Sequence, residues 1–216
     1  MINIDVNVHK DFQLPAPPAV ALRILDAVKE KNVIAQSLSR VISSEPALSA
    51  RILKIANSSL FGNRVKIHTI DHAIALMGAE TLKNIALSFV IANTSRGAQS
   101  NGFDFNMFWK RSLTSAVSSN LLADTLGLNK ENTFVAGLLK DIGMLFMYLA
   151  HPDTYLTVFR EKMSSRLTLV EAERTVFGFD HQEMGAAILE HWSFPGQVFH
   201  PIRFHHRSRR APVSIQ

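Results

Sequence analysis

The sequence predicts an all-α protein made of an N-terminal helical bundle and a second helical lobe. Apolar residues recur at intervals of three and four through nearly the whole chain, which is the spacing of one face of an α-helix. Glycine and proline contribute only 10 and 8 of the 216 residues, which disfavours a turn-rich β-sandwich or barrel. With 47% hydrophobic and 19% charged residues, the chain can bury a substantial core and is not globally disordered.

The first helices have recognisable start signals. After an extended lead-in from Phe12, Pro17 and Pro18 open a first helix, because proline suits the first helical turn. The run Ser44-Glu45-Pro46 opens another, with an acid near the positive end of the helix dipole. Further helices are expected over 34–43, 70–77, 79–93, 107–126, 132–150, 152–163, 169–177, 182–192 and 197–206.

Polar residues and glycine mark where several of these helices end or begin. Asn57 and Ser58 end the third helix, where their side chains are expected to satisfy backbone groups and to serve folding more than ligand recognition. Thr69 is expected to cap the helix over 70–77, and Gly78 to end it.

The segment 95–102 is the best candidate for a boundary, because it clusters turn formers and lacks apolar residues. We therefore expect one domain over residues 12–206, with an N-terminal helical lobe over 12–96 and a second helical lobe over 97–206. A basic tail over 207–216 follows.

Composition and charge exclude several function classes. The chain has no cysteine, which rules out disulfides, zinc ribbons, iron–sulfur clusters and cysteine nucleophiles. The net charge is +5, but four arginines lie in the last fourteen residues, so the basicity belongs to the tail and argues only weakly for nucleic acid. The N-terminus lacks the pattern of a signal peptide, and the most apolar stretch, 133–150, is interrupted by charge. We expect a cytoplasmic protein with no membrane partner.

The predicted helix over 132–150 is apolar on all sides, yet it carries Lys140 and Asp141. Buried charges are normally paired or bound to a ligand. Adjacent helical residues project about 100° apart, so these two are not expected to face each other and each needs another partner. A structural network and a functional site are both open interpretations.

Three histidines lie downstream, at His181, His205 and His206. Histidines and one aspartate on separate helices of a bundle are the usual composition of a metal centre. None of these residues has the tight spacing of a helical metal motif, so the pattern alone is a weak indication.

Several motifs resemble a known family. The run from Gly137 to Gly143, Gly-Leu-Leu-Lys-Asp-Ile-Gly, resembles the GLLHDIG signature of the HD superfamily of metal-dependent phosphohydrolases. The HDOD branch is indicated by further motifs: Glu45-Pro46-Ala47-Leu48, Arg51-Ile52-Leu53, Ala56-Asn57-Ser58, Ala73–Gly78, Phe108–Ser112, His181–Gly185 and Trp192–Pro195. His205-His206 resembles the paired histidines of the related HD-GYP branch, and the resemblance as a whole runs from about residue 14 to residue 206.

The resemblance implies an all-helical bacterial signalling module in which an N-terminal bundle joins an HD-like lobe. It also implies a metal site in the catalytic relatives, where Asp141 matches the signature aspartate and His181, His205 and His206 match later histidines. Two positions depart from that pattern, because Lys140 and Arg111 stand where histidines are expected.

These departures suggest a vestigial site formed by Arg111, Lys140, Asp141, His181, His205 and His206. Lysine and arginine bring positive charge and no free lone pair at neutral pH, so either residue pointing inward should weaken binding of a divalent metal. We hypothesise that one of them pairs with Asp141 in place of a metal, leaving a structural ion-pair core or an anion-binding pocket.

Three function classes follow. The first is a non-catalytic regulatory module that binds a signalling protein partner or a small ligand and needs no cofactor, with a homodimer as one permitted arrangement. The second is a phosphohydrolase acting on a nucleotide or cyclic dinucleotide, with a divalent metal held by Asp141, His181, His205 and His206. A nucleic-acid binder that uses Arg203–Arg210 ranks lowest.

Overall fold

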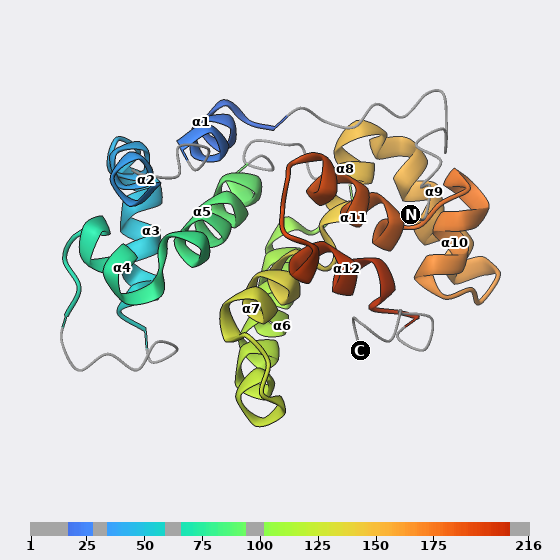
Figure 1. The fold of residues 1–216 in the computed structure, drawn as a ribbon. Coiled ribbons are helices and arrows are strands. Elements are labelled where there is room, and N and C mark those ends of the chain that lie inside the picture. Colours follow the sequence, from blue (N-terminus) through green and yellow to red (C-terminus); the bar gives the residue numbers. More distant parts are fainter. Residues whose placement is uncertain (1–16, 28–33, 59–65, 94–101, 208–216) are drawn as a thin grey trace. The chain divides into compact units, whose positions relative to one another are not determined.

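The computed structural model describes residues 17–27, 34–58, 66–93 and 102–207. These ranges contain helices and no strand, which confirms the all-α prediction (Figure 1). The helices are α1 (Ala19–Ala27), α2 (Ile34–Ser43), α3 (Pro46–Ala56), α4 (Ile70–Met77), α5 (Ala79–Asn93), α6 (Phe105–Leu126), α7 (Lys130–Leu139), α8 (Ile142–Ala150), α9 (Pro152–Ser164), α10 (Leu169–Phe177), α11 (His181–His191) and α12 (Gly196–Phe204).

The helices form two compact units, and their division departs from the predicted seam near residue 97. Among the described residues, the N-terminal unit combines those between 17 and 93 with 106–139, and the C-terminal unit combines 102–105 with 140–207. The physical reason is that α5 packs against α7, so the chain returns to the N-terminal helices after the expected boundary. The predicted lead-in from residue 12, most of the 95–102 segment and the tail after Arg207 lie outside the described residues.

In the N-terminal unit, α5 is the central helix and packs against α1, α2, α3, α4 and α7. It buries Leu82, Ile85 and Ile91 almost completely, which explains why it is apolar over most of its surface. The two predicted signals before it are confirmed. The Thr69 hydroxyl accepts a hydrogen bond from the His72 amide, and Gly78 ends α4 with a φ of 83°, a value that favours glycine.

Asn57 ties the end of α3 to a segment ten residues later. Its Nδ2 donates to the carbonyl oxygens of Leu53 and Ile67 at 2.8 Å, and its Oδ1 accepts from the Ile67 amide at 2.8 Å. The Ser58 hydroxyl donates to the Ile55 carbonyl at 2.6 Å. The two residues therefore satisfy backbone groups at a helix end, as the sequence predicts.

Replacing Asn57 with alanine should lower the free energy of unfolding by about 1–2 kcal/mol, because three hydrogen bonds to the backbone are lost together. Urea denaturation measures the change. Ser58→Ala is the matched control, since it removes one local bond only. If Asn57→Ala cost no more than this control, the tie to Ile67 would not be a stabilising contact.

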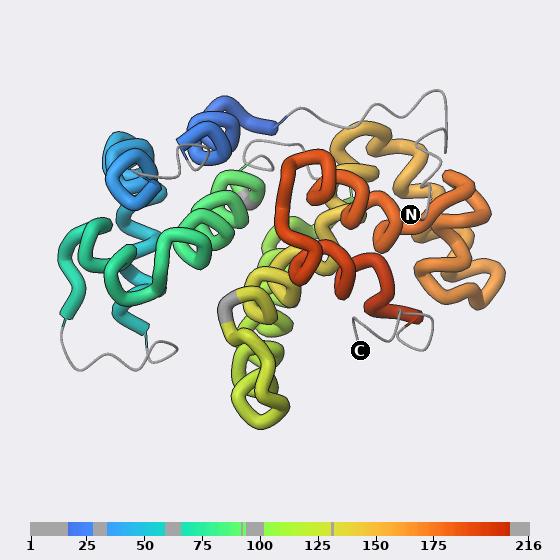
Figure 2. Tube along the Cα trace, in the orientation of Figure 1, coloured from blue at the N-terminus to red at the C-terminus, as the bar shows by residue number. Residues whose placement is uncertain are grey.

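In the C-terminal unit, α8 contacts two helix pairs, α9 with α10 and α11 with α12. Helix α8 packs against α9 and α11, while α9 also packs on α10 and α11 on α12. The side-by-side course of α11 and α12 can be followed in the chain trace (Figure 2). Aromatic rings fill the space beside α9, where Phe103 stacks on Tyr148 with centroids 4.7 Å apart and Tyr155 contacts Phe177 at 6.0 Å. Trp192 is fully buried and meets Phe146 edge to face.

The predicted single helix over 132–150 is wrong. It is interrupted at Lys140 and Asp141, so that α7 ends at Leu139 and α8 begins at Ile142. Asp141 has φ −100° and ψ 11°, outside the helical region, and its carbonyl accepts from the Met144 amide. The stretch 132–150 is long and apolar enough to cross a membrane, but 72% of its window is buried within the protein, as in a core helix.

Candidate functional site

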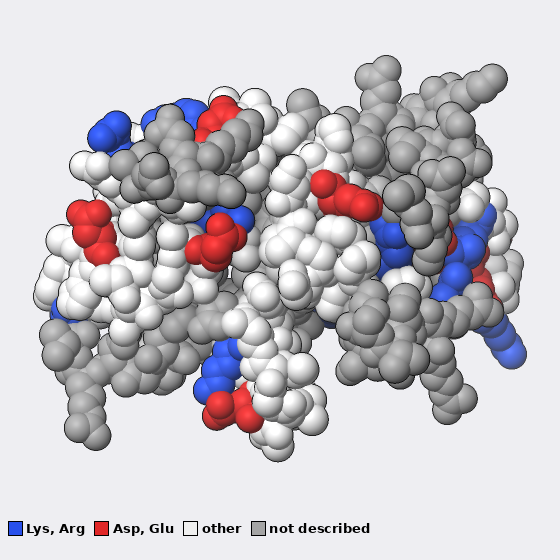
Figure 3. Space-filling view, viewed as in Figure 1, with Lys and Arg blue, Asp and Glu red and all other residues white. Residues whose placement is uncertain are grey.

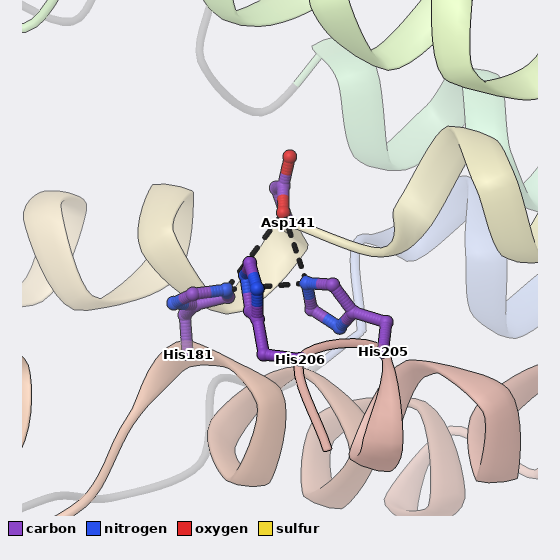
Figure 4. A group of neighbouring side chains, drawn as sticks. All are labelled: Asp141, His181, His205 and His206. Carbon is purple, nitrogen blue, oxygen red and sulfur yellow. Dashed lines mark hydrogen bonds and ion pairs between the residues drawn. The ribbon is translucent and has the colours of Figure 1, made fainter. Parts of the chain in front are cut away.

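Four side chains of the C-terminal unit meet in one cluster. They are Asp141, His181, His205 and His206, and one ligating atom from each lies within 4.8 Å of the others (Figure 4). The structure thus brings together the four residues that the sequence nominated as candidate metal ligands. Asp141 and His181 are buried, while His205 is partly buried and His206 is exposed.

Helix ends hold the four residues in place. Asp141 occupies the interruption before α8, His181 is the first residue of α11, and His205 and His206 follow α12. The start of α11 is fixed by a capping box, in which Asp180 accepts from the amides of Gln182 and Glu183. Because α11 packs on both α8 and α12, its first turn brings the three segments together.

His181 is oriented by a fully buried carboxylate. Its Nδ1 lies 2.6 Å from Glu173 Oε2, and its backbone amide donates to the same oxygen at 3.0 Å. The other oxygen of Glu173 accepts from the Tyr155 hydroxyl at 2.6 Å. Burial and the charge of Glu173 raise the pKa of Tyr155 well above its usual value, so the hydroxyl keeps the proton that it donates. With Nδ1–H bound to Glu173, the Nε2 lone pair of His181 points toward the cluster.

His205 has the same orientation through a different partner. Its Nδ1 lies 2.7 Å from the Ile202 carbonyl oxygen, which can only accept, so Nδ1 carries a hydrogen. Its Nε2 lies 3.3 Å from Asp141 Oδ1 and 3.3 Å from His181 Nε2. His181 Nε2 lies 3.8 Å from the same carboxylate oxygen. Three potential ligand atoms therefore converge, an arrangement that a proton on His205 Nε2, donated to Asp141 Oδ1, or a metal cation between them would stabilise.

Lys140 pairs directly with its neighbour, which corrects the expectation that the two adjacent residues need separate partners. The Lys140 ammonium contacts Asp141 Oδ2, the oxygen turned away from the histidines. The direct pair forms because the chain is not helical at these two residues. Their side chains are therefore not held about 100° apart, as adjacent side chains of a helix are. Burial alone would raise the pKa of Asp141, but the hydrogen bond from His205 and the charge of Lys140 outweigh burial and lower it strongly.

Arg111, the second predicted departure, lies exposed on α6 in the N-terminal unit. Of the two cations that the sequence offered as partners for Asp141, the structure pairs Lys140 with it. The hypothesis of an ion pair at the signature aspartate therefore rests on Lys140.

His206 is held through its backbone. The His206 amide donates to Gln182 Oε1 at 2.8 Å, and Gln182 Nε2 donates to Asp180 Oδ2 at 3.3 Å. Burial first, and then the neighbouring imidazoles of His205 and His181, lower the pKa of His206 to about 4. Its imidazole is therefore neutral near pH 7, the form that binds metals.

Sequence reasoning missed the residues that support the cluster. Glu173 and Tyr155 orient His181. Asp180 accepts hydrogen bonds from Arg174, from Arg207 and from two amides at the start of α11. Glu173 and Asp180 are both fully buried. One signal was available, since Glu173 follows the buried Ala172 on the inward side of α10, where an acid needs a buried partner.

The donor set fits one divalent cation in ligand type and spacing. A carboxylate oxygen and three imidazoles suit zinc, manganese or iron, and the bond from Glu173 to His181 is the outer-shell contact typical of such sites. The Lys140 ammonium on the same carboxylate opposes that cation. The cluster thus combines the ligands of a metal centre with a fixed positive charge beside them.

The chain is similar to a known protein family and to a curated bacterial protein. The HDOD domain model matches residues 14–208. A curated protein from Treponema pallidum (strain Nichols), named only as uncharacterized, is 27% identical over 210 residues, which is 92% of this chain and 39% of that protein. This chain therefore spans well under half the length of that relative.

Solved structures share the fold. A candidate phosphohydrolase from Shewanella amazonensis SB2B is 27% identical, with a TM-score of 0.74 over 92% of this chain and 70% of that one. An HDOD domain protein of unknown function from Geobacter sulfurreducens is also 27% identical, with a TM-score of 0.73 over 93% and 67%. A candidate signal transduction protein from Marinobacter aquaeolei VT8 is 23% identical, with a TM-score of 0.67 over 93% and 46%, and shows similarity of fold alone.

Proposed function

Because this chain belongs to the HDOD domain family, we propose that it is a non-catalytic regulatory module of bacterial signalling that binds a protein partner or a small ligand. The cluster at Asp141 then acts as a structural ion-pair core of the C-terminal unit. One observation carries the proposal, namely the contact between the Lys140 ammonium and the carboxylate of Asp141.

The charge of Lys140 opposes a metal cation at Asp141. Two like unit charges 4 Å apart repel by about 4 kcal/mol at an effective dielectric constant of 20, and a divalent ion doubles the charge product. Lys140 shares the carboxylate of Asp141 that a metal would need, and its side chain is only 29% exposed, so water screens the repulsion incompletely. Hydrolysis in this superfamily needs a metal to activate water, so weak metal binding supports a role without catalysis.

Replacing Lys140 with histidine is expected to raise the affinity for Mn²⁺ or Zn²⁺ by at least about tenfold, because the change removes a cation and adds a ligand. Metal content after dialysis against a fixed metal concentration measures it. Lys140→Gln separates the two effects, since it removes the charge and adds no imidazole. Lys162→His, on α9, controls for adventitious binding to a surface histidine.

The unmodified protein should retain little metal in the same measurement. A near-stoichiometric metal in the unmodified protein, lost in Asp141→Ala, would contradict the proposal.

A metal-dependent phosphohydrolase is the second candidate, favoured by the four ligating atoms within 4.8 Å and by the orientation of His181. Under this alternative, Asp141, His181, His205 and His206 hold the cation, and a nucleotide or cyclic dinucleotide is the substrate. Phosphate release that requires added metal and disappears in Asp141→Ala would establish it. The chain as it stands should show no such release.

A further inference from the structure

The long helix α6 exposes an apolar stripe that neither the family nor the cluster explains. Leu113, Val117 and Leu121 follow one another at intervals of four residues and are 51%, 37% and 65% exposed. We call these three residues the α6 stripe. The buried residues of the helix lie on another side, centred about 120° around the helix axis from the stripe: Phe108, Ser112, Ala116, Asn120 and Ala123.

That buried side is already occupied by α7. A Cβ atom added at Gly137 would lie 2.9 Å from the Ala116 Cα, so the two backbones are in close contact. Asn120 Nδ2 also donates to the Lys130 carbonyl at the start of α7. The α6 stripe lies to one side of this contact with α7, and its three side chains remain exposed.

Other exposed leucines lie near the end of the helix, on a different face from the α6 stripe. Leu122, Leu126 and Leu128 are 61%, 66% and 52% exposed. A single exposed leucine is ordinary on a protein surface, but three apolar residues in successive turns of one face, as in the α6 stripe, indicate an interaction site. In the space-filling view, the projecting end of α6 and α7 is mostly uncharged, with one basic and one acidic patch side by side (Figure 3).

The order of residues along α6 is symmetric about Val117. Leu113 and Leu121 lie four residues on either side of it, and Lys110 and Asp124 lie seven residues on either side. Seven residues are nearly two helical turns, so both charges lie on the same face as Val117. If a second copy of the helix runs in the opposite direction about Val117, each apolar residue of the stripe faces an apolar residue. Each of the two charges then faces a charge of opposite sign.

We propose that the α6 stripe binds a second copy of this chain, with the two α6 helices antiparallel and the two-fold axis passing at Val117. In this arrangement Leu113 of each copy packs on Leu121 of the other. Lys110 of each copy meets Asp124 of the other, which gives one ion pair at each end. A two-fold interface must be self-complementary in this way, because the same patch serves both subunits.

The dimensions suit such an interface. A helix of 22 residues is about 33 Å long, and the segment from Lys110 to Asp124 spans about 21 Å of it, so the whole self-complementary pattern fits within α6. Asp124 now pairs with Lys130 at 2.7 Å, but the two side chains are 71% and 42% exposed. A pair so exposed is weak, so Asp124 can also accept Lys110 of the second copy.

The first test measures mass by light scattering during size exclusion of the full chain. The expected mass is that of two chains, shifting to one chain in Leu121→Glu. Met163→Glu is the control, because Met163 is 79% exposed on α9 and lies off this face. A single-chain mass for the unmodified protein at every concentration, or equal effects of the two variants, would overturn the proposal.

A second test uses the absence of cysteine. Val117→Cys introduces the only thiol, so oxidised glutathione should convert it rapidly to a disulfide-linked dimer. Ser118→Cys, one residue round the helix, should link much more slowly. Equal rates would place the axis elsewhere and reject the proposed geometry.

The end pairs are tested by reversing charges. Lys110→Glu and Asp124→Lys should each weaken the dimer several-fold, because each sets like charges against one another. The double variant should recover the affinity of the unmodified chain. Additive losses in the double variant would contradict the antiparallel pairing.

Discussion

Replacing Gly143 with alanine should destabilise the C-terminal unit by at least about 3 kcal/mol, one of the largest effects expected from a single added methyl group. The added Cβ would lie 2.1 Å from the carbonyl oxygen of His181 and 2.8 Å from the amide nitrogen of Gly185. Both contacts are with backbone, so no side chain can move aside. The only relief is to separate α8 from α11.

That separation would also disturb the cluster. Asp141 directly precedes α8 and His181 begins α11, so moving the two helices apart lengthens the distance between the two side chains. Urea denaturation measures the loss of stability, and the imidazole resonances of His181 and His205 in NMR spectra report on the cluster. Gly185→Ala is the matched control, because its nearest contact is looser, at 3.2 Å. Equal losses in the two variants would contradict the close approach at Gly143.

Replacing Glu173 with alanine should lower the free energy of unfolding by about 3–5 kcal/mol, as expected when one member of a buried charged network is removed. The change leaves three donors without a partner in a fully buried position: the Tyr155 hydroxyl, the His181 amide and His181 Nδ1. It also leaves a cavity, which adds to the cost.

Tyr155→Phe separates these contributions. It removes the hydroxyl and one hydrogen bond while keeping the ring, so it should cost only about 1 kcal/mol. Glu173→Gln keeps the size of the side chain and should fall between the two. A loss in Glu173→Ala no greater than that in Tyr155→Phe would show that the carboxylate does not organise His181.

Helix ends with local signals could be predicted from the sequence, and those without them could not. The ranges 34–43, 70–77, 79–93 and 169–177 coincide with the helices observed, helped by signals such as Thr69 and Gly78. The interruption at Lys140 and Asp141 contains no glycine or proline to announce it. It depends on the pairing of those two side chains and on the histidines across from them, which are contacts between distant residues.

The candidate site shows the same limit. Its four potential ligands could be named from motif resemblance, because those residues stand in recognisable runs. The outer contacts from Glu173 and Asp180 belong to no such run and arise only when α9, α10 and α11 pack together. The division into units escaped prediction for a similar reason, since α7 joins the N-terminal helices by packing and not by position in the chain.

The contacts of Asp180 have a mechanical consequence. Arg207 lies 3.5 Å from this buried carboxylate, and the neighbouring His206 amide donates to Gln182 in the first turn of α11. A force applied to the chain beyond Arg207 would therefore be transmitted to the first turn of α11, where His181 sits. The last described residues of the chain are thus bonded to the same helix turn that holds His181 in the cluster.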